Sequence, residues 1–327
     1  MEGVAVVGAG ISGLLATQRL RARGISVTLL DQAPSPGGRL ATRVIDDATV
    51  DHGAQFLTAR EAPFVELMEA WRGEGCPIRV WAHGFARADT IDDLPGGALP
   101  AEDGHPRYVV GGGMATLAAH LAAEVPARCG HAATRAEPVA GGWRVHADTV
   151  SGPVTVDAEA LLLTAPLPRS AALLEGGLDV AGIDGYDPCV ALLAPLDRAP
   201  ALPEPGGVQF AGGPVSWLAD NAAKGISSQP ALTVHASAEE SVLLEGMSDD
   251  HVATRLWSLV EPWVAGAQPT TRLVERWPHA QPRGLHPQRC LRTEVRGRPL
   301  VLAGDAFAGP RVEGAALSGL AAAEALG

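Results

Sequence analysis

Long apolar runs are missing from this sequence of 327 residues, and none approaches the length that a membrane-spanning helix requires. A positively charged segment with a small-residue cleavage site is also missing before the first predicted strand, so we expect a cytoplasmic protein without a membrane partner. Positive charge is scarce as well: 25 lysines and arginines face 37 aspartates and glutamates, for a formal net charge of −12. Because such a surface repels nucleic acid and anionic lipid, neither is expected as a partner.

Paired cysteines are missing too. The four cysteines are scattered, without a C-x-x-C pair, and no histidine stands at zinc-ligand spacing. The sequence therefore predicts four buried thiols in a reducing compartment, no disulfide framework and no bound metal. With 46% hydrophobic residues, the chain is instead long enough for about two domains that share a large core.

Glycine stands where a nucleotide-binding turn needs it. The apolar run 4–7 predicts a buried parallel strand, and Gly8-Ala9-Gly10-Ile11-Ser12-Gly13 leads from it into an apolar helical face. Gly8 permits the tight turn, Gly10 lets the backbone approach a pyrophosphate, and Gly13 lets helix and strand pack closely. A second strand ends in Asp31, whose carboxylate suits ribose hydroxyls. This order predicts a dinucleotide site and leaves NAD and FAD both open.

Two stretches that follow favour FAD, the larger dinucleotide with a flat ring system. In Gly37-Gly38-Arg39 the glycines allow a loop to fold over the dinucleotide, and Arg39 suits its phosphates or ring system. Residues 50–57 predict a short strand and a bend that brings Gln55 to the edge of a flat ring, with Phe56 covering one face.

The C-terminal part of the sequence supplies further walls for such a cofactor. A buried strand ends in Gly304-Asp305, and Asp305 is predicted to accept a hydrogen bond from a ribityl hydroxyl. The stretch 312–319 opens a final helix, whose N-terminus suits the negative charge of a reduced flavin. Another predicted strand ends at Thr164, which we expect at a third edge of the same crevice.

Several basic residues have two interpretations. Lys224 is the only lysine, and its small, polar neighbours predict a solvated loop lysine, with a catalytic lysine as the alternative. His235 ends an apolar run and is either a satisfied core histidine or a residue of the substrate face. Seven arginines within 272–298 predict a mixed-charge surface or, alternatively, a grip on substrate phosphates.

These blocks together resemble the FAD-binding amine-oxidase superfamily. The resemblance rests on Gly8–Gly13, Asp31, Gly37–Arg39, the Asp51–Gln55 bend, Gly111–Met114, Gly304-Asp305 and Arg311–Ala315. Within that superfamily, the stretches Asp51–Phe56, Trp217–Lys224 and Trp277–Pro282 are similar to bacterial renalase-like proteins.

The resemblance implies an α/β fold: a Rossmann-type FAD-binding domain with a parallel sheet, and a smaller α+β substrate domain that covers the flavin. The FAD-binding domain is expected from residues 1–60, 106–168 and 272–327, and the substrate domain from residues 61–105 and 169–271. The expected cofactor-binding residues are Gly8, Gly10, Ile11, Ser12, Gly13, Asp31, Gln32, Gly38, Arg39, Ala54, Gln55, Phe56, Thr164, Gly304, Asp305, Val312, Glu313 and Ala315. The expected catalytic residues, at the face where substrate stacks, are Gln55, Phe56, His235 and Trp277.

The narrower resemblance implies an oxidase that takes a hydride from misreduced dihydropyridine isomers of NAD(P)H to FAD, with dioxygen as acceptor and hydrogen peroxide as product. Loss of hydride leaves a stable pyridinium, so no general base is required, and the sequence has no convincing acid–base pair. The alternatives are a biosynthetic amine oxidase or desaturase for a small amine or heterocycle, and a flavoprotein without turnover. In classical amine oxidases of this superfamily a lysine assists the reaction with dioxygen, and the sequence does not place Lys224 there. We expect a monomer or a small homo-oligomer.

Overall fold

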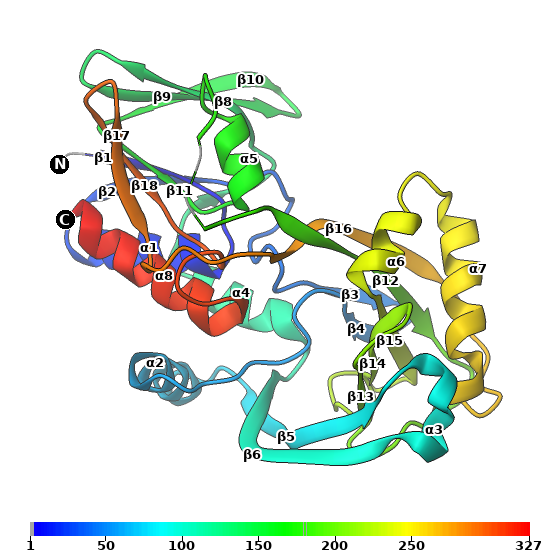
Figure 1. The fold of residues 1–327 in the computed structure, drawn as a ribbon. Coiled ribbons are helices and arrows are strands. Elements are labelled where there is room, and N and C mark those ends of the chain that lie inside the picture. The colour runs from blue at the N-terminus through cyan, green and yellow to red at the C-terminus, as the bar shows by residue number, and fades with distance from the viewer. Residues whose placement is uncertain (1–2, 179, 181) are drawn as a thin grey trace.

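The computed structural model describes residues 3–178, 180 and 182–327 of the chain. One half of the molecule is built on a six-stranded sheet in the order β17-β18-β11-β1-β2-β7, with strands from both ends of the sequence (Figure 1). The strands are β1 (Gly3–Val7), β2 (Ser26–Leu30), β7 (Ala127–Arg128), β11 (Ala160–Leu163), β17 (Leu291–Val295) and β18 (Arg298–Leu302). All neighbours are parallel except β17 and β18. Because parallel strands end at one edge, the residues after β1, β2, β11 and β18 gather there.

Both faces of this sheet are covered. One face packs on α1 (Ile11–Ala22), α2 (Ala62–Gly73), α4 (Met114–Ala122) and α8 (Arg311–Leu326), whose apolar residues share one core. The other face packs on α5 (Leu167–Ala172) and on a small antiparallel sheet of β8 (Ala132–Val139), β9 (Gly142–Thr149) and β10 (Gly152–Ala158). The predicted Rossmann-like α/β architecture is confirmed.

The other half of the molecule is built on a seven-stranded sheet in the order β16-β12-β15-β14-β13-β5-β6. Its strands are β5 (Ile78–Ala88), β6 (Leu99–Val110), β12 (Tyr186–Pro195), β13 (Gly207–Phe210), β14 (Val215–Asp220), β15 (Ala231–Ala236) and β16 (Leu273–Pro282). The helices α6 (Ala238–Leu243) and α7 (Asp249–Val260), with the short η2 (Glu261–Trp263), lie to one side, at the right of Figure 1. The short elements η1 (Ile91–Asp93) and α3 (Leu94–Gly97) link β5 to β6.

Side-chain alternation along β15 decides what each face of this sheet contacts. Leu232, Val234 and Ala236 join the core under α7, whereas Ala231 packs on the hairpin of β3 (Thr42–Ile45) and β4 (Ala48–Asp51). Successive side chains of a strand point to opposite faces. Thr233 and His235 therefore share the face of Ala231, toward the hairpin and the bend after it.

The division of the chain into two domains stays a prediction, and some segments pack on a sheet other than the one that the predicted ranges give them. Strand β16 pairs with β12 in the seven-stranded sheet, although residues 272–327 were expected in the FAD-binding domain. Helix α2 buries Phe64, Met68 and Trp71 in the core of the six-stranded sheet, although residues 61–105 were expected in the substrate domain. Both segments bury apolar residues against partners that lie far away in the sequence. Among the described residues, no helix has the length and apolar character that a bilayer span requires.

Candidate functional site

A cavity of about 490 Å³ lies between the two large sheets, at the edge where the parallel strands end. Most of the predicted site residues line it: Gly10, Ile11, Ser12, Arg39, Ala54, Gln55, Phe56, Thr164, His235, Trp277, Gly304, Asp305, Val312 and Ala315. Six predicted residues lie outside its lining: Gly8, Gly13, Asp31, Gln32, Gly38 and Glu313. Whether any of these residues binds cofactor or substrate stays a prediction.

The glycine turn has one open position and two packed ones. A Cβ on Gly13 would lie 1.9 Å from the carbonyl oxygen of Gly8, and a Cβ on Gly8 would lie 2.7 Å from Thr164 Oγ1. Gly8 also has φ +109°, a conformation that favours glycine. A Cβ on Gly10 would meet nothing within 4 Å, because Gly10 faces the cavity.

A dinucleotide with a flat ring fits the groups around this opening. Helices α1 and α8 both begin at the cavity wall without a side-chain cap, so their first backbone N–H groups are free for an acceptor. The hydroxyl of Ser12, in the first turn of α1, is buried and has no hydrogen-bond partner in the described chain. Free N–H groups at a helix N-terminus suit phosphate and other anionic oxygens. We expect α1 to hold the pyrophosphate and α8 to face the ring.

Three predicted cofactor-binding side chains, those of Asp31, Gln32 and Glu313, form hydrogen bonds with other parts of the protein. The carboxylate of Asp31 accepts hydrogen bonds from the backbone N–H groups of Ala9, at 2.5 Å, and of Ala33, at 2.8 Å. It thereby ties the end of β2 to the glycine turn. Glu313 accepts from the backbone N–H groups of residues 60 and 61, and Gln32 accepts from Arg169 at the exposed surface.

Arg39 and Asp305 meet each other in the cavity wall. The guanidinium donates to both carboxylate oxygens, with Nη1–Oδ2 at 2.6 Å and Nη2–Oδ1 at 2.7 Å, and Tyr186 donates to Oδ1 at 3.2 Å. Burial opposes the charge of Arg39, but Asp305 outweighs it and raises the arginine pKa. That Arg39 lies against the phosphates or the ring system of a cofactor stays a prediction: its guanidinium is paired with a carboxylate in the cavity wall, and the pair is neutral overall.

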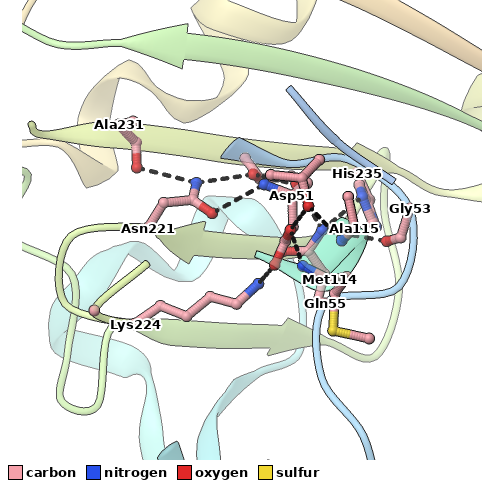
Figure 2. Close-up of polar contacts among 12 residues, drawn as sticks. Asp51, Gly53, Gln55, Met114, Ala115, Asn221, Lys224, Ala231 and His235 are labelled. Atoms are coloured by element: carbon pink, nitrogen blue, oxygen red, sulfur yellow. Dashed lines mark hydrogen bonds and ion pairs between the residues drawn. The ribbon is translucent and has the colours of Figure 1, made fainter. Parts of the chain in front are cut away.

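The bend after β4 is built on Asp51 (Figure 2). Its Oδ1 accepts from Thr42 Oγ1 at 2.5 Å and from the Met114 N–H at 2.8 Å, and its Oδ2 contacts Lys224 Nζ at 2.6 Å. The main-chain oxygen of Asp51 accepts from Gln55 Nε2 at 2.8 Å. Gln55 Oε1 is left without a partner in the described chain, at the cavity wall.

The prediction of a solvated Lys224 is wrong. Its side chain has an exposed fraction of 0%, its ammonium pairs with Asp51, and Nζ lies 5.6 Å from the centre of the Trp81 ring. Burial lowers the pKa of Lys224, and Asp51 opposes that shift. Lys224 lies outside the cavity lining. The small neighbours that suggested a solvated loop instead let the loop pack against β4.

Trp277 and two histidines form the wall near the bend. Trp277 stacks on His52 with ring centroids 5.4 Å apart and donates from Nε1 to the main-chain oxygen of His52 at 2.9 Å. His235 Nε2 lies 3.5 Å from Gln55 Nε2. Burial lowers the pKa of both His52 and His235 to about 4, so neither carries charge at neutral pH. This wall is therefore flat, aromatic and uncharged.

Sequence reasoning missed several residues of the lining: His52, Cys189, Gln209, Ser216, Trp217 and Arg311. Trp217 pairs across the sheet with His235, so strand alternation from His235 would have found it once the pairing was known. The seven arginines of 272–298 are all outside the cavity lining. Of these, Arg276, Arg283, Arg289 and Arg296 pair with carboxylates.

Two family models match the sequence. The model of a Rossmann-like NAD(P)-binding domain matches residues 6–71, and the model of the flavin containing amine oxidoreductases matches residues 97–327. The second match covers more than half of the chain.

Each of two curated relatives matches the chain over a short stretch. A hydroxyneurosporene desaturase of Rubrivivax gelatinosus is 49% identical over 57 residues, which are 17% of this chain and 11% of the relative. Protoporphyrinogen oxidase 2 of Arabidopsis thaliana is 38% identical over 66 residues, which are 20% of this chain and 13% of the relative. The matches thus span only a small part of each relative.

Solved structures share the whole fold. A putrescine oxidase with bound putrescine has a TM-score of 0.72 at 17% identity, with 99% of this chain and 98% of that chain covered. An Exiguobacterium protein assigned as a protoporphyrinogen oxidase has a TM-score of 0.74 at 14% identity, with the same shares covered. At these identities the likeness is one of fold.

Proposed function

Because the chain belongs to the flavin containing amine oxidoreductase family, and is a FAD-dependent oxidoreductase, we propose that it oxidises the uncharged dihydropyridine ring of a nucleotide substrate. The substrates proposed are misreduced isomers of NAD(P)H. One hydride leaves the ring for FAD, and dioxygen with one proton takes up the electron pair, so that NAD(P)⁺ and hydrogen peroxide are the products. FAD supplies the two-electron chemistry, and the chain's residues bind and orient.

The lack of an unpaired carboxylate among the described lining residues of the cavity is the observation that carries this proposal. Asp187 and Asp305 are the carboxylates among the described lining residues. Asp305 is paired with Arg39, and Asp187 lies 3.3 Å from Arg283. The described lining residues therefore offer no unpaired carboxylate to an ammonium substrate, and His52 and His235, which are neutral at pH 7, add no charge. A neutral ring substrate needs none.

The chain's own residues give such a ring its place. Trp277 is fixed by its stack on His52 and its hydrogen bond to the backbone, so it presents a preset flat surface. Phe56 and Trp217, whose ring centroids lie 5.8 Å apart, add apolar surface that excludes water. Arg311 lies exposed in the lining and has no ion-pair partner in the described chain, so it suits a substrate phosphate.

Anaerobic stopped-flow spectroscopy tests the proposal. The FAD-loaded protein is mixed with misreduced NAD(P)H isomers and, separately, with a panel of amines that includes putrescine. We expect the isomers to bleach the flavin absorbance rapidly and the amines to leave it unchanged. Bleaching by amines alone would refute the proposal.

A biosynthetic amine oxidase or desaturase is the second candidate function. The stretch that is 49% identical to a hydroxyneurosporene desaturase favours it, and so does the apolar character of Phe56 and Trp217. Bleaching by an apolar polyene or by a neutral heterocyclic amine, without bleaching by the isomers, would support this candidate. A flavoprotein without turnover would stay oxidised with every substrate.

A further inference from the structure

We propose that Lys224 and Asp51 are a positioning pair, which holds the bend of residues 52–56 in place as one wall of the cavity. The pair joins the two halves of the molecule. Asp51 accepts a hydrogen bond from α4, which packs on the six-stranded sheet, and Lys224 belongs to the loop of residues 221–227 after β14 of the seven-stranded sheet. The inference rests on the site of the proposed oxidase, and it holds whichever substrate that site takes.

Lys224 is held rigidly from several directions. Its side chain is fully buried, with Nζ 2.6 Å from Asp51 Oδ2 and against the Trp81 ring. Its main-chain oxygen accepts from Arg79 Nη2 at 2.8 Å, which fixes the loop to β5. The same loop contacts β4, where the Thr49 N–H donates to Ser227 Oγ at 3.1 Å. The ammonium therefore reaches Asp51 from a loop that has little freedom to move.

Asp51 passes this restraint on to the bend. Its carboxylate has donors on both oxygens: Lys224 on Oδ2, and Thr42 with the N-terminus of α4 on Oδ1 (Figure 2). Gly113 makes the approach to α4 feasible, because a Cβ there would lie 2.8 Å from Asp51 Oδ1. A carboxylate with this set of partners keeps the backbone of residue 51 in one position.

The backbone of Asp51 in turn orients a residue of the cavity wall. Gln55 Nε2 donates to the main-chain oxygens of Asp51 at 2.8 Å and Gly53 at 3.2 Å, so its amide has one orientation, with Oε1 left unpaired. Thr233 Oγ1 also donates to the Asp51 oxygen at 2.8 Å and accepts from Asn221 Nδ2 at 2.9 Å. A shift of Asp51 therefore displaces Gln55 and its neighbour His52, both of which line the cavity.

The geometry assigns Lys224 a role different from a direct reaction with dioxygen. Its ammonium is committed to Asp51, and neither member of the pair lies in the cavity lining. Loss of a positioning lysine should alter the binding and environment of FAD and leave the reaction of reduced FAD with dioxygen unchanged. Loss of an oxygen-activating lysine should do the reverse, so one set of variants separates the two roles.

The variants are Lys224→Met, Asp51→Asn and the double variant, with Arg255→Met as matched control. Arg255 pairs with the buried Glu240 under the same sheet but away from the bend, so its loss also leaves a buried carboxylate without its cation. In the double variant no charge of the pair remains buried, and the amide that Asp51→Asn introduces keeps an acceptor oxygen for Thr42 and α4.

Two measurements need no substrate: titration of the apoprotein with FAD, and the visible circular dichroism of the bound flavin. We expect each single variant to weaken FAD binding about tenfold or more and to change the dichroism of the bound flavin. The double variant should recover most of the affinity and of the dichroism. The size of the effect follows because the interaction free energy between residues of one network corresponds to about a tenfold change in a dissociation constant. Arg255→Met should match the unaltered protein in both. Unaltered FAD binding and dichroism in Lys224→Met, or no recovery in the double variant, would overturn the proposal.

The cycle itself supplies the third measurement. After photoreduction, Lys224→Met should react with dioxygen at the rate of the unaltered protein, and a large loss of that rate with unchanged dichroism would overturn the proposal in favour of oxygen activation. If no dihydropyridine reduces any variant, the proposed function fails while these measurements still decide the positioning role.

Because Lys224 is the only lysine, mass spectrometry after amine-reactive labelling should find it modified only after denaturation in the unaltered protein, and already in the folded state of Asp51→Asn.

Discussion

Substitution of two glycines in the first turn should affect the stability of the apoprotein differently, which separates cofactor binding from folding. A Cβ at Gly13 would lie 1.9 Å from the Gly8 oxygen, against 3.4 Å for an ordinary contact, so the backbone would have to move by about 1.5 Å (3.4 − 1.9). Overpacking of this kind costs about 3 kcal/mol in free energy of unfolding. We therefore expect Gly13→Ala to destabilise the apoprotein and to lose FAD as a consequence.

Gly10→Val should spare the fold and lose the cofactor. Gly10 has φ −71° and ψ 178°, which any residue adopts, and its Cβ would point into open space. At such an N-cap position a glycine replacement changes the free energy of unfolding by no more than about 1 kcal/mol. The valine side chain, however, fills the space where the backbone approaches the pyrophosphate, and we expect a loss of FAD affinity of about a hundredfold or more.

The assay compares the two variants without FAD and then with it. Urea denaturation of each apoprotein, followed by the fluorescence of the seven tryptophans, gives the free energy of unfolding. Titration with FAD gives the affinity. A Gly10→Val protein that retains stoichiometric FAD, or that unfolds as readily as Gly13→Ala, would refute the assignment of Gly10 to the cofactor.

Three other predictions concern charge and the aromatic wall. Burial lowers the pKa values of His52 and His235 from 6.5 to about 4, so on acidification the unfolded chain binds protons before the folded protein does. The free energy of unfolding should therefore fall by about 3 kcal/mol per histidine between pH 6.5 and pH 4. Above pH 6.5 these histidines should leave it unchanged. Urea denaturation across this range checks it, and a His235→Asn protein with an unchanged acid slope would contradict it. Trp277→Phe keeps a ring but removes the hydrogen bond to His52, so flavin reduction should slow about tenfold, with FAD affinity unchanged in titration; a variant as fast as the unaltered protein would show that the wall needs only an apolar ring. Arg311→Gln should raise KM for phosphate-bearing isomers about tenfold and leave KM for a dihydropyridine without phosphate unchanged, and equal effects on both substrates would exclude a phosphate contact.

Local sequence patterns were enough to predict the strands, the glycine turn and the helix that surround the site. The order of strand, glycine turn and helix at residues 4–20 predicts β1 and α1, and the rule that parallel strands end at one edge brings Thr164 and Gly304 to the same cavity. These inferences hold because each depends on a few neighbouring residues. The recognised superfamily is confirmed by the family model, while the renalase-like subfamily stays a prediction.

Pairings between distant residues could not be predicted in the same way. Asp51 and Lys224 are 173 positions apart, and a lysine among small residues is solvated unless a buried carboxylate is near it in the fold. Arg39 and Asp305 were both predicted at the site, but their mutual contact depends on how β18 and the glycine loop meet. His52 was missed because its stack on Trp277 depends on the position of β16 beside β12. Tertiary contacts, which no local pattern records, decide each of these.

The contact between α1 and α8 has a consequence for synthesis of the protein. A Cβ on Gly319 would lie 2.2 Å from the Ser12 oxygen, so α1 and α8 touch backbone to backbone, and the two helices lie side by side in Figure 1. Residues 312 and 315 of α8 also line the cavity. While the ribosome is still translating, a chain that lacks α8 has the glycine turn without the wall opposite it. Cofactor loading must therefore wait until α8 has been synthesised, and a chain released before residue 311 would reach the cell's quality-control proteases without FAD to stabilise it.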